Sequence, residues 1–172
     1  MREAEKKIRE RPALAQECAR LRAAGKTVVF TNGCFDLMHA GHATYLEFAR
    51  RQGDVLVVGL NTDASVRRYK GEKRPVVDER NRARLMAALE CVDFVTWFDE
   101  DEPKALIAEL QPDVLVKAED WAHYVSGREI VEARGGKVVL APMVAGLSTT
   151  KLIEKIVQAY GASLDYPDGI DP

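Results

Sequence analysis

The stretch TNGCFDLMHAGH, residues 31–42, joins a β-branched run that begins at residue 26 to an amphipathic pattern over 41–52. A buried strand that leads through a glycine into a helix is typical of a crossover in a parallel sheet. The same alternation continues along the chain. Further strands are predicted at 54–61, 94–98, 113–118 and 137–142, and further helices at 79–91, 103–110, 126–134 and 149–160. The sequence therefore predicts an α/β fold, a Rossmann-like, doubly wound, five-stranded parallel sheet.

Length and charge restrict the class of protein. The chain has 172 residues, with 25 Lys and Arg against 27 Asp and Glu and a net charge of -2, so we expect one main domain and no nucleic-acid partner. No apolar run approaches the roughly 18–20 residues of a membrane span, and the first residues lack the apolar core of a secretory signal. The three cysteines, Cys18, Cys34 and Cys91, form no CxxC pair. We therefore expect a cytoplasmic protein with reduced thiols and no membrane association.

Three segments are expected along the chain: a charged N-terminal helical extension over 1–25, a main domain over 26–160 and a polar tail over 161–172. Ser148 is placed to cap the last helix of the main domain, and Gly161 to end it. Four apolar residues of that helix are spaced for one buried stripe, namely Leu152, Ile153, Ile156 and Val157.

In such a sheet, ligands bind beyond the carboxyl ends of the strands, where 31–42 lies. The chain lacks both GxxxxGK[ST] and GxGxxG, so another device must hold any phosphate. His39-Ala40-Gly41-His42 opens the first crossover helix, whose free N–H groups and dipole favour an anion, and Gly41 permits close approach. The two imidazoles add donors on one face. The alternatives are two packed histidines, or a zinc ion held by Cys34, His39 and His42, for which no fourth ligand is close in sequence.

Together with Leu147-Ser148-Thr149-Thr150-Lys151 near the end of the chain, these residues resemble the cytidylyltransferase-like nucleotidyltransferase superfamily, the HxGH type of this fold. Within it, the sequence is most similar to the D-glycero-β-D-manno-heptose 1-phosphate adenylyltransferases of ADP-heptose synthesis. The likeness covers most of the chain. It implies transfer of AMP from ATP to a sugar 1-phosphate, with release of pyrophosphate, in the synthesis of lipopolysaccharide core precursors.

The resemblance also implies roles for individual residues. His39, His42 and Lys70 would be catalytic, the histidines by stabilising charge at the α-phosphorus and Lys70 by closing over the phosphates. Arg82 is alternatively an exposed helix residue, and Trp121 alternatively packs on the sheet edge. Contacts to the acceptor or its phosphate are expected from Asp36, Lys70, Arg82, Lys117 and Trp121. The nucleotide would bind at Thr31, Asn32, Gly33, Cys34, Phe35, His39, Gly41, His42, Asp120, Ser148, Thr149 and Thr150.

Differences from the heptose enzymes keep an alternative open. Those enzymes have Lys-Gly-Gly-Asp after the fourth strand, whereas this chain has Lys117-Ala118-Glu119-Asp120, so Glu119 is expected to add charge beside the nucleotide. Asp120-Trp121 resembles the glycerol-3-phosphate cytidylyltransferases, which use CTP. Those enzymes carry an arginine where this chain has Met143, and the missing donor favours adenine over cytosine. An alternative of another class is a nucleotide-binding module without catalysis, against which the joint presence of both histidines and Lys70 argues.

The resemblance further implies the ligands and partners of the protein. ATP is expected as a substrate, with Mg²⁺ bound mainly through phosphates and water and no metal site in the protein. A homo-oligomer is expected, as a dimer, and neither nucleic acid nor membrane is expected as a partner. Because 172 residues leave no room for a sugar kinase as well, we expect a separate kinase to supply the sugar 1-phosphate.

Overall fold

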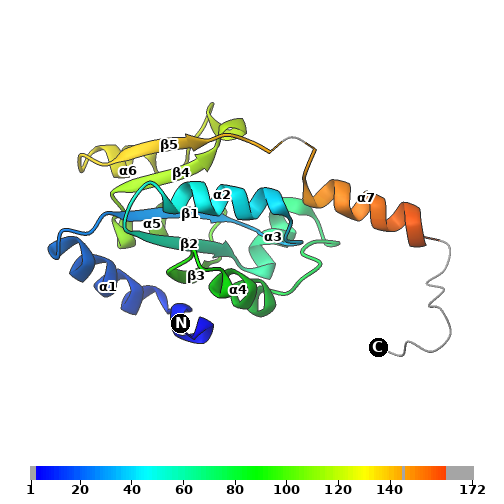
Figure 1. The fold of residues 1–172 in the computed structure, drawn as a ribbon, viewed down its shortest axis with the longest axis horizontal. Coiled ribbons are helices and arrows are strands. Elements are labelled where there is room, and N and C mark those ends of the chain that lie inside the picture. Colours follow the sequence, from blue (N-terminus) through cyan, green and yellow to red (C-terminus); the bar gives the residue numbers. More distant parts are fainter. Residues whose placement is uncertain (1–2, 145, 162–172) are drawn as a thin grey trace.

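The computed structural model describes residues 3–144 and 146–161, and its centre is a five-stranded sheet (Figure 1). The strands lie in the order β3-β2-β1-β4-β5, and every neighbouring pair is parallel. Their bounds are β1 Val28–Gly33, β2 Val55–Asn61, β3 Phe94–Phe98, β4 Val114–Ala118 and β5 Lys137–Ala141. The predicted α/β fold with a five-stranded parallel sheet is therefore confirmed.

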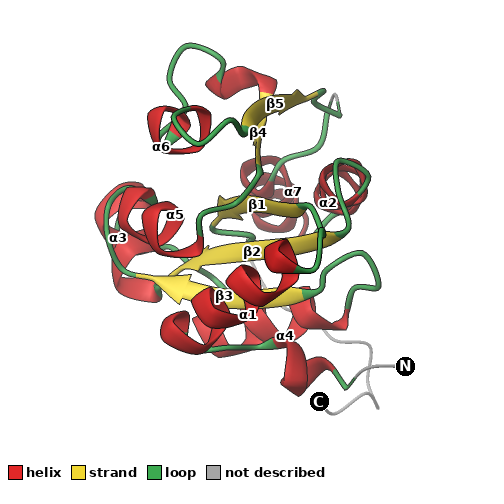
Figure 2. Cartoon of the chain, turned by 90° about the vertical axis from the view of Figure 1, so that its left-hand side faces the viewer, coloured by secondary structure: helices red, strands yellow, loops and turns green. Residues whose placement is uncertain are grey.

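Helices cover both faces of this sheet (Figure 2). One core cluster includes Leu46 of α2 and Met86 of α4, and the other includes Leu14 of α1, Leu106 of α5 and Val131 of α6. The strands between them are buried on both sides, which explains their continuous apolar sequence. The helices of the two layers are α2 Ala40–Arg50 and α4 Glu79–Ala88 on one face, and α1 Arg11–Ala23, α5 Lys104–Leu110 and α6 Arg128–Glu132 on the other.

The strand order places a topological switch point between β1 and β4. From β1 the chain moves outward through β2 to β3, then returns to the other side of β1 to form β4 and β5. Crossovers on the two sides of this point leave the sheet on opposite faces, so a crevice opens beyond the carboxyl ends of β1 and β4. The stretch 31–42 begins at that edge.

The N-terminal segment differs from the expected single helical pattern. A short 3-10 helix, η1 Ala4–Lys7, is followed by an extended turn in which Ile8 pairs in parallel with Val95 and the Arg9 N–H donates to the Val95 carbonyl at 2.9 Å. Helix α1 begins only after this turn, with Pro12 in its first turn, a position where the missing N–H costs nothing. The predicted helix is therefore interrupted at Ile8 and Arg9, because these residues pair with the exposed edge of β3.

A helix that is not among those predicted from the sequence follows β2. Helix α3 spans Asp63–Lys70, and the Thr62 hydroxyl caps it by accepting from the Ser65 N–H at 3.2 Å. Its length is near the lower limit at which apolar periodicity becomes visible, and its buried residues are only Ser65 and Val66. The helix presents its last residue, Lys70, at the carboxyl edge of the sheet.

The last helix, α7 Thr149–Tyr160, corrects one prediction and confirms two. Ser148 caps it, its hydroxyl accepting from the Lys151 N–H at 3.1 Å, and Gly161 ends it. The predicted buried stripe is wrong, because Ile156 and Val157 are 51% and 61% exposed. The helix projects away from the sheet rather than packing on it (Figure 1). Its apolar residues are spaced for one face, but no other element of the described chain covers that face.

Among residues 3–144 and 146–161, no helix combines the length and apolarity needed to cross a membrane. The predicted polar tail, 161–172, lies outside the described residues except for Gly161.

Candidate functional site

The loop between β1 and α2 folds over the carboxyl edge of the sheet. Gly33 ends β1, and Phe35 takes a left-handed conformation with φ of 44°, which a non-glycine residue rarely adopts. The buried Phe35 ring meets the His42 ring with centroids 5.3 Å apart and planes at 63°. Phe35 therefore packs against His42 and supports the direction in which its imidazole points.

The two histidines lie at the start of α2 with their rings stacked, centroids 3.8 Å apart. Burial lowers the pKa of His39, and burial followed by the neighbouring His39 lowers the pKa of His42 to about 4. Both imidazoles are therefore neutral near pH 7. The Nδ1 atoms of both are buried and have no hydrogen-bond partner among the described residues, a state that few buried polar atoms of a native protein share.

Gly41, between them, has a role in addition to the expected close approach of a phosphate. A Cβ at this position would lie 3.0 Å from Cε1 and Nδ1 of His39 and 3.5 Å from Leu147. The missing side chain therefore makes room for the His39 ring, in addition to any approach by a phosphate. The contact also explains how the HxGH spacing allows two stacked imidazoles on one helical turn.

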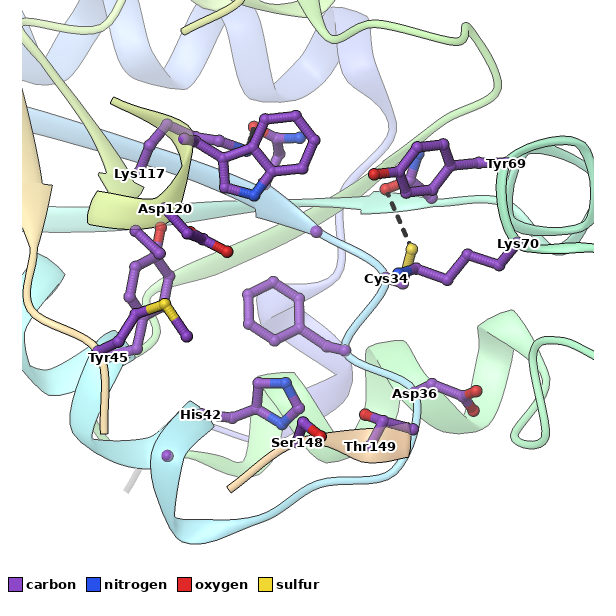
Figure 3. Close-up of a pocket in the computed structure, with 18 of the residues that line it drawn as sticks. Cys34, Asp36, His42, Tyr45, Tyr69, Lys70, Lys117, Asp120, Ser148 and Thr149 are labelled. Atoms are coloured by element: carbon purple, nitrogen blue, oxygen red, sulfur yellow. Dashed lines mark hydrogen bonds between the residues drawn. The ribbon is translucent and has the colours of Figure 1, made fainter. Parts of the chain in front are cut away.

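The N-terminus of α7 reaches the same pocket as that of α2. Ser148, Thr149 and Thr150 line it together with His39 and His42, and Figure 3 shows His42, Ser148 and Thr149 on one side of the pocket. Free N–H groups at both helix starts favour an anion. Residues more than a hundred positions apart thus form one candidate phosphate site, as the resemblance implied.

Lys117 stands at the end of β4, largely buried within the pocket wall. Its Nζ donates to Asn32 Oδ1 at 3.2 Å and lies 5.3 Å from the centre of the Trp121 ring. Burial lowers the pKa of Lys117 to about 8, although Asp120 acts in the opposite direction. The ammonium keeps donors that Asn32 does not use, which suits it to a ligand oxygen in the pocket.

Two further predicted residues, Lys70 and Cys34, line the pocket. Lys70 is exposed, and its Nζ lies 5.0 Å from the Tyr69 ring; both are on the opposite side of the view in Figure 3 from Asp120 and Tyr45. The Cys34 Sγ lies 3.8 Å from Asn61 Oδ1, and burial raises the pKa of the Cys34 thiol. Cys34 is therefore protonated near pH 7 and acts as a packing residue.

The carboxylate of Asp36 is already engaged by the protein. It is 1% exposed, pairs with Arg74 Nε at 2.5 Å, and accepts from the Val76 and Val77 N–H groups at 2.9 Å each. Burial raises its pKa and these donors lower it, with a net fall. Asp36 thus ties the segment after α3 to the loop after β1, and positions the loop rather than presenting a free carboxylate.

Thr31 and Arg82 are placed behind the site. Neither lines the pocket, and both are fully buried. The Thr31 hydroxyl donates to the Val116 carbonyl at 3.0 Å and contacts the Tyr45 hydroxyl at 2.6 Å. The expectation that Arg82 is either a ligand contact or exposed is not met, because its guanidinium holds four groups of the protein: the carbonyls of Cys34, Asn61 and Val77 and the carboxylate of Asp63.

Glu119 also differs from expectation. Its carboxylate accepts from the Met143 N–H at 2.9 Å, and it does not line the pocket. The glutamate therefore ties the turn after β4, which includes the 3-10 helix η2 Glu119–Trp121, to the segment after β5. This turn leaves Asp120 and Trp121 at the pocket.

The whole pocket has a volume of about 600 Å³ and contains residues that the sequence analysis missed. Asn61 ends β2 and Tyr69 lies inside α3, a helix that was not predicted, whereas Tyr45 lies inside α2. Asp101 and Glu102 follow β3, and the rule that ligands lie beyond strand ends would have found them had it been applied to the third strand. In the described ranges, no three His, Cys, Asp or Glu side chains converge to hold a metal ion.

Comparison with known proteins agrees with this geometry. A family model described as cytidylyltransferase-like matches residues 30–155. A bifunctional protein HldE of Citrifermentans bemidjiense is 56% identical over 160 residues, 92% of this chain and 33% of the relative. One of Trichlorobacter lovleyi is 54% identical, with the same coverage. The chain thus spans about a third of the length of these curated relatives. A lipopolysaccharide core biosynthesis protein from Thermoplasma volcanium superposes with a TM-score of 0.56 and 26% identity, over 70% of this chain and 98% of its own.

Proposed function

The chain belongs to the cytidylyltransferase-like family, and we propose that it is an adenylyltransferase that transfers AMP from ATP to D-glycero-β-D-manno-heptose 1-phosphate. The products are ADP-heptose and pyrophosphate. The heptose resemblance of the sequence supports this acceptor, as do relatives named HldE and a structural neighbour named for lipopolysaccharide core biosynthesis. We assign the reaction to residues 26–160.

One observation carries the proposal: two helix N-termini, two neutral imidazoles and two lysines border one pocket. Nucleotidyl transfer needs donors preorganised around a phosphorus that gains charge, and it needs no covalent intermediate on the protein. The two imidazoles, whose Nδ1 atoms have no partner among the described residues, would contact the nucleotide. A carboxylate or thiol nucleophile is not required.

In the proposed step, an oxygen of the acceptor phosphate attacks the α-phosphorus of ATP. The bond from the α-phosphorus to the bridging oxygen breaks, and pyrophosphate leaves with that oxygen. His39 and His42 would donate to the triphosphate, together with the N–H groups at the starts of α2 and α7. Their neutral state near pH 7 means that they act as hydrogen-bond donors rather than as resident cations.

The two lysines would act on different phosphates. Lys117, held by Asn32 at the end of β4, is fixed and suits the acceptor phosphate, whose attack needs a defined direction. Lys70 is exposed at the end of α3 and suits the triphosphate that it would cover. Asp120, Thr149 and Thr150 would complete the nucleotide site, and Trp121 would border the acceptor.

ATP would enter as its magnesium complex. No three metal-binding side chains converge in the described part of the chain, so the ion would be held by the triphosphate and water. Its charge would offset that of the triphosphate while the two substrates approach each other. Met143 lines the pocket without a charged group, which supports adenine as the base.

We further propose that the protein acts as a cytoplasmic dimer. The exposed apolar residues of α7, which include Ile156, Val157 and Tyr160, support self-association, because a face of this kind is otherwise left in water. The acceptor carries a phosphate that a sugar kinase must install, so the proposed reaction follows a kinase step.

Pyrophosphate release tests the proposed reaction. The protein is incubated with ATP or CTP, Mg²⁺ and either heptose 1-phosphate or glycerol 3-phosphate. We expect release only with ATP and heptose 1-phosphate. Release with CTP and glycerol 3-phosphate alone would favour the cytidylyltransferase alternative, and nucleotide binding without release from any pairing would favour a non-catalytic module.

A further inference from the structure

The pocket has a second side whose chemistry differs from that of the histidine side. Helix α2 covers one face of the sheet, whereas α5 and α6 cover the other. The loops that lead into α5 and α6 therefore border the pocket across from His39 and His42. They contribute Asp101, Glu102 and Tyr124 to its lining, so carboxylates and an aromatic ring replace the N–H donors of the helix starts.

Glu102 is held in place by the opposite loop. The Tyr124 hydroxyl lies 3.0 and 2.9 Å from its two carboxylate oxygens, and the Ser126 hydroxyl donates to Oε2 at 2.9 Å. Glu102 follows β3 and its two partners follow β4, and these strands are separated in the sheet by β2 and β1. The contact thus joins two distant loops above the strand ends.

The ionisation of Glu102 limits what can bind beside it. Hydrogen bonds from Tyr124 and then Ser126 lower its pKa, so the group is a carboxylate near pH 7. The Lys104 ammonium also pairs with it, with Nζ 3.7 Å from Oε2. An ionised carboxylate only accepts hydrogen bonds and has about four lone-pair sites, of which Tyr124, Ser126 and Lys104 leave part unused. Its side chain is 46% exposed. A ligand next to it must therefore donate, as a hydroxyl does, and a triphosphate is repelled.

Two aromatic residues of the loop after β4 line the pocket together with this carboxylate. Tyr124 is 45% exposed, and Trp121 lines the same pocket with Lys117 over its ring. Apolar ring faces cover the C–H groups of a ligand, while the carboxylate accepts from its hydroxyl groups. Beside them, Lys117 offers a cation for a phosphate. A molecule that has both hydroxyl groups and one phosphate matches the three features together.

We propose that Glu102 accepts hydrogen bonds from the hydroxyl groups of the acceptor, so that this side of the pocket selects a polyhydroxylated phosphate ester. The inference rests on the proposed function, since it identifies the determinant of acceptor choice in the same pocket. Glu102 acts as a specificity residue and takes no part in the displacement at phosphorus. Tyr124 and Ser126 are positioning residues that act through it.

Glu102→Gln tests this role, because the amide retains the size of the carboxylate and an oxygen for Tyr124 but loses the charge. The KM for heptose 1-phosphate is expected to rise about tenfold, the loss typical of a charge-assisted hydrogen bond, while the KM for ATP and kcat stay within about twofold. Tyr124→Phe, which leaves the carboxylate with Ser126, is expected to give a smaller rise. Glu132→Gln is the matched control, since Glu132 pairs with Arg128 on the outside of α6 and does not line the pocket.

Calorimetric titration with heptose 1-phosphate in the absence of ATP separates this inference from the proposed reaction. If the wild type forms no ADP-heptose, the proposed function fails, and the titration of wild type and Glu102→Gln still reports on Glu102. An unchanged acceptor affinity in Glu102→Gln overturns the inference alone. A parallel rise of both KM values with a lower melting temperature would instead assign Glu102 a merely structural role.

Discussion

The imidazole rings of His39 and His42 stack with centroids 3.8 Å apart, and neither Nδ1 has a hydrogen-bond partner among the described residues. Burial lowers the pKa of both rings, and the neighbouring His39 lowers that of His42 further, so both are neutral near pH 7. Buried polar atoms without a partner are few in native proteins, and a catalytic role is one reason for which they are kept. The pair therefore marks the centre of the candidate site.

His42→Ala should lower kcat far more than it lowers stability. Loss of one preorganised donor in an electrostatic site costs about 2.7–4 kcal/mol of transition-state stabilisation, or roughly 10²–10³ in kcat. The fold loses two ring contacts, the stacking on His39 and the edge contact with Phe35. Steady-state kinetics and thermal melting of the same preparation check this, and a fall in melting temperature in proportion to the lost activity would support two packed histidines instead.

The lowered pKa of His42 predicts how the free energy of unfolding depends on pH. Because the folded state lowers the pKa of His42 to about 4 from 6.5, the unfolded chain binds more protons between these values. The free energy of unfolding is therefore fully retained above about pH 6.5 and falls as the pH drops toward 4. Urea unfolding of wild type and His42→Gln at pH 7 and pH 5 should give a smaller loss in the variant. Equal losses in both would contradict burial of a neutral His42.

Gly41→Ala should separate helix stability from activity. Alanine favours a helix by up to about 1 kcal/mol over glycine, but its Cβ would lie 3.0 Å from the His39 ring and displace it. We expect a lower kcat without a lower melting temperature, measured side by side. Full activity in the variant would show that the position of the His39 ring is unimportant.

Arg82→Ala should destabilise the fold by about 3–5 kcal/mol, because it removes a buried guanidinium and leaves Asp63 unpaired. Arg80→Ala is a matched control on the same helix, where an exposed arginine should cost within about 0.5 kcal/mol. Chemical denaturation measures both. A small cost at Arg82 would mean that its four contacts are replaced by water.

Ile156→Glu should weaken the proposed dimer without unfolding the chain, because Ile156 is exposed on α7 and its replacement buries no charge in the monomer. Sedimentation equilibrium is expected to give a dimer for the wild type and a monomer for the variant. Lys155→Glu, on the same helix and also exposed, serves as the control for charge. A wild-type monomer would contradict self-association.

Patterns of sequence predicted the strands and most helices because burial on both faces leaves continuous apolar runs. The prediction was less complete where a segment makes few apolar contacts. Helix α3 buries only Ser65 and Val66, and its short length leaves no clear period. For α7 the period was present, but a sequence pattern does not say whether another layer covers it.

The sequence alone determined the parallel α/β fold and the two motifs that meet at the site, because strand and helix periods and helix-start residues are local properties. Only the tertiary structure decided what each side chain faces. It turned Arg82 and Asp36 inward as supports, tied Glu119 to Met143, and brought Glu102 to Tyr124 from strands that are not neighbours. Such contacts depend on the relative placement of segments far apart in the chain, which no local pattern contains.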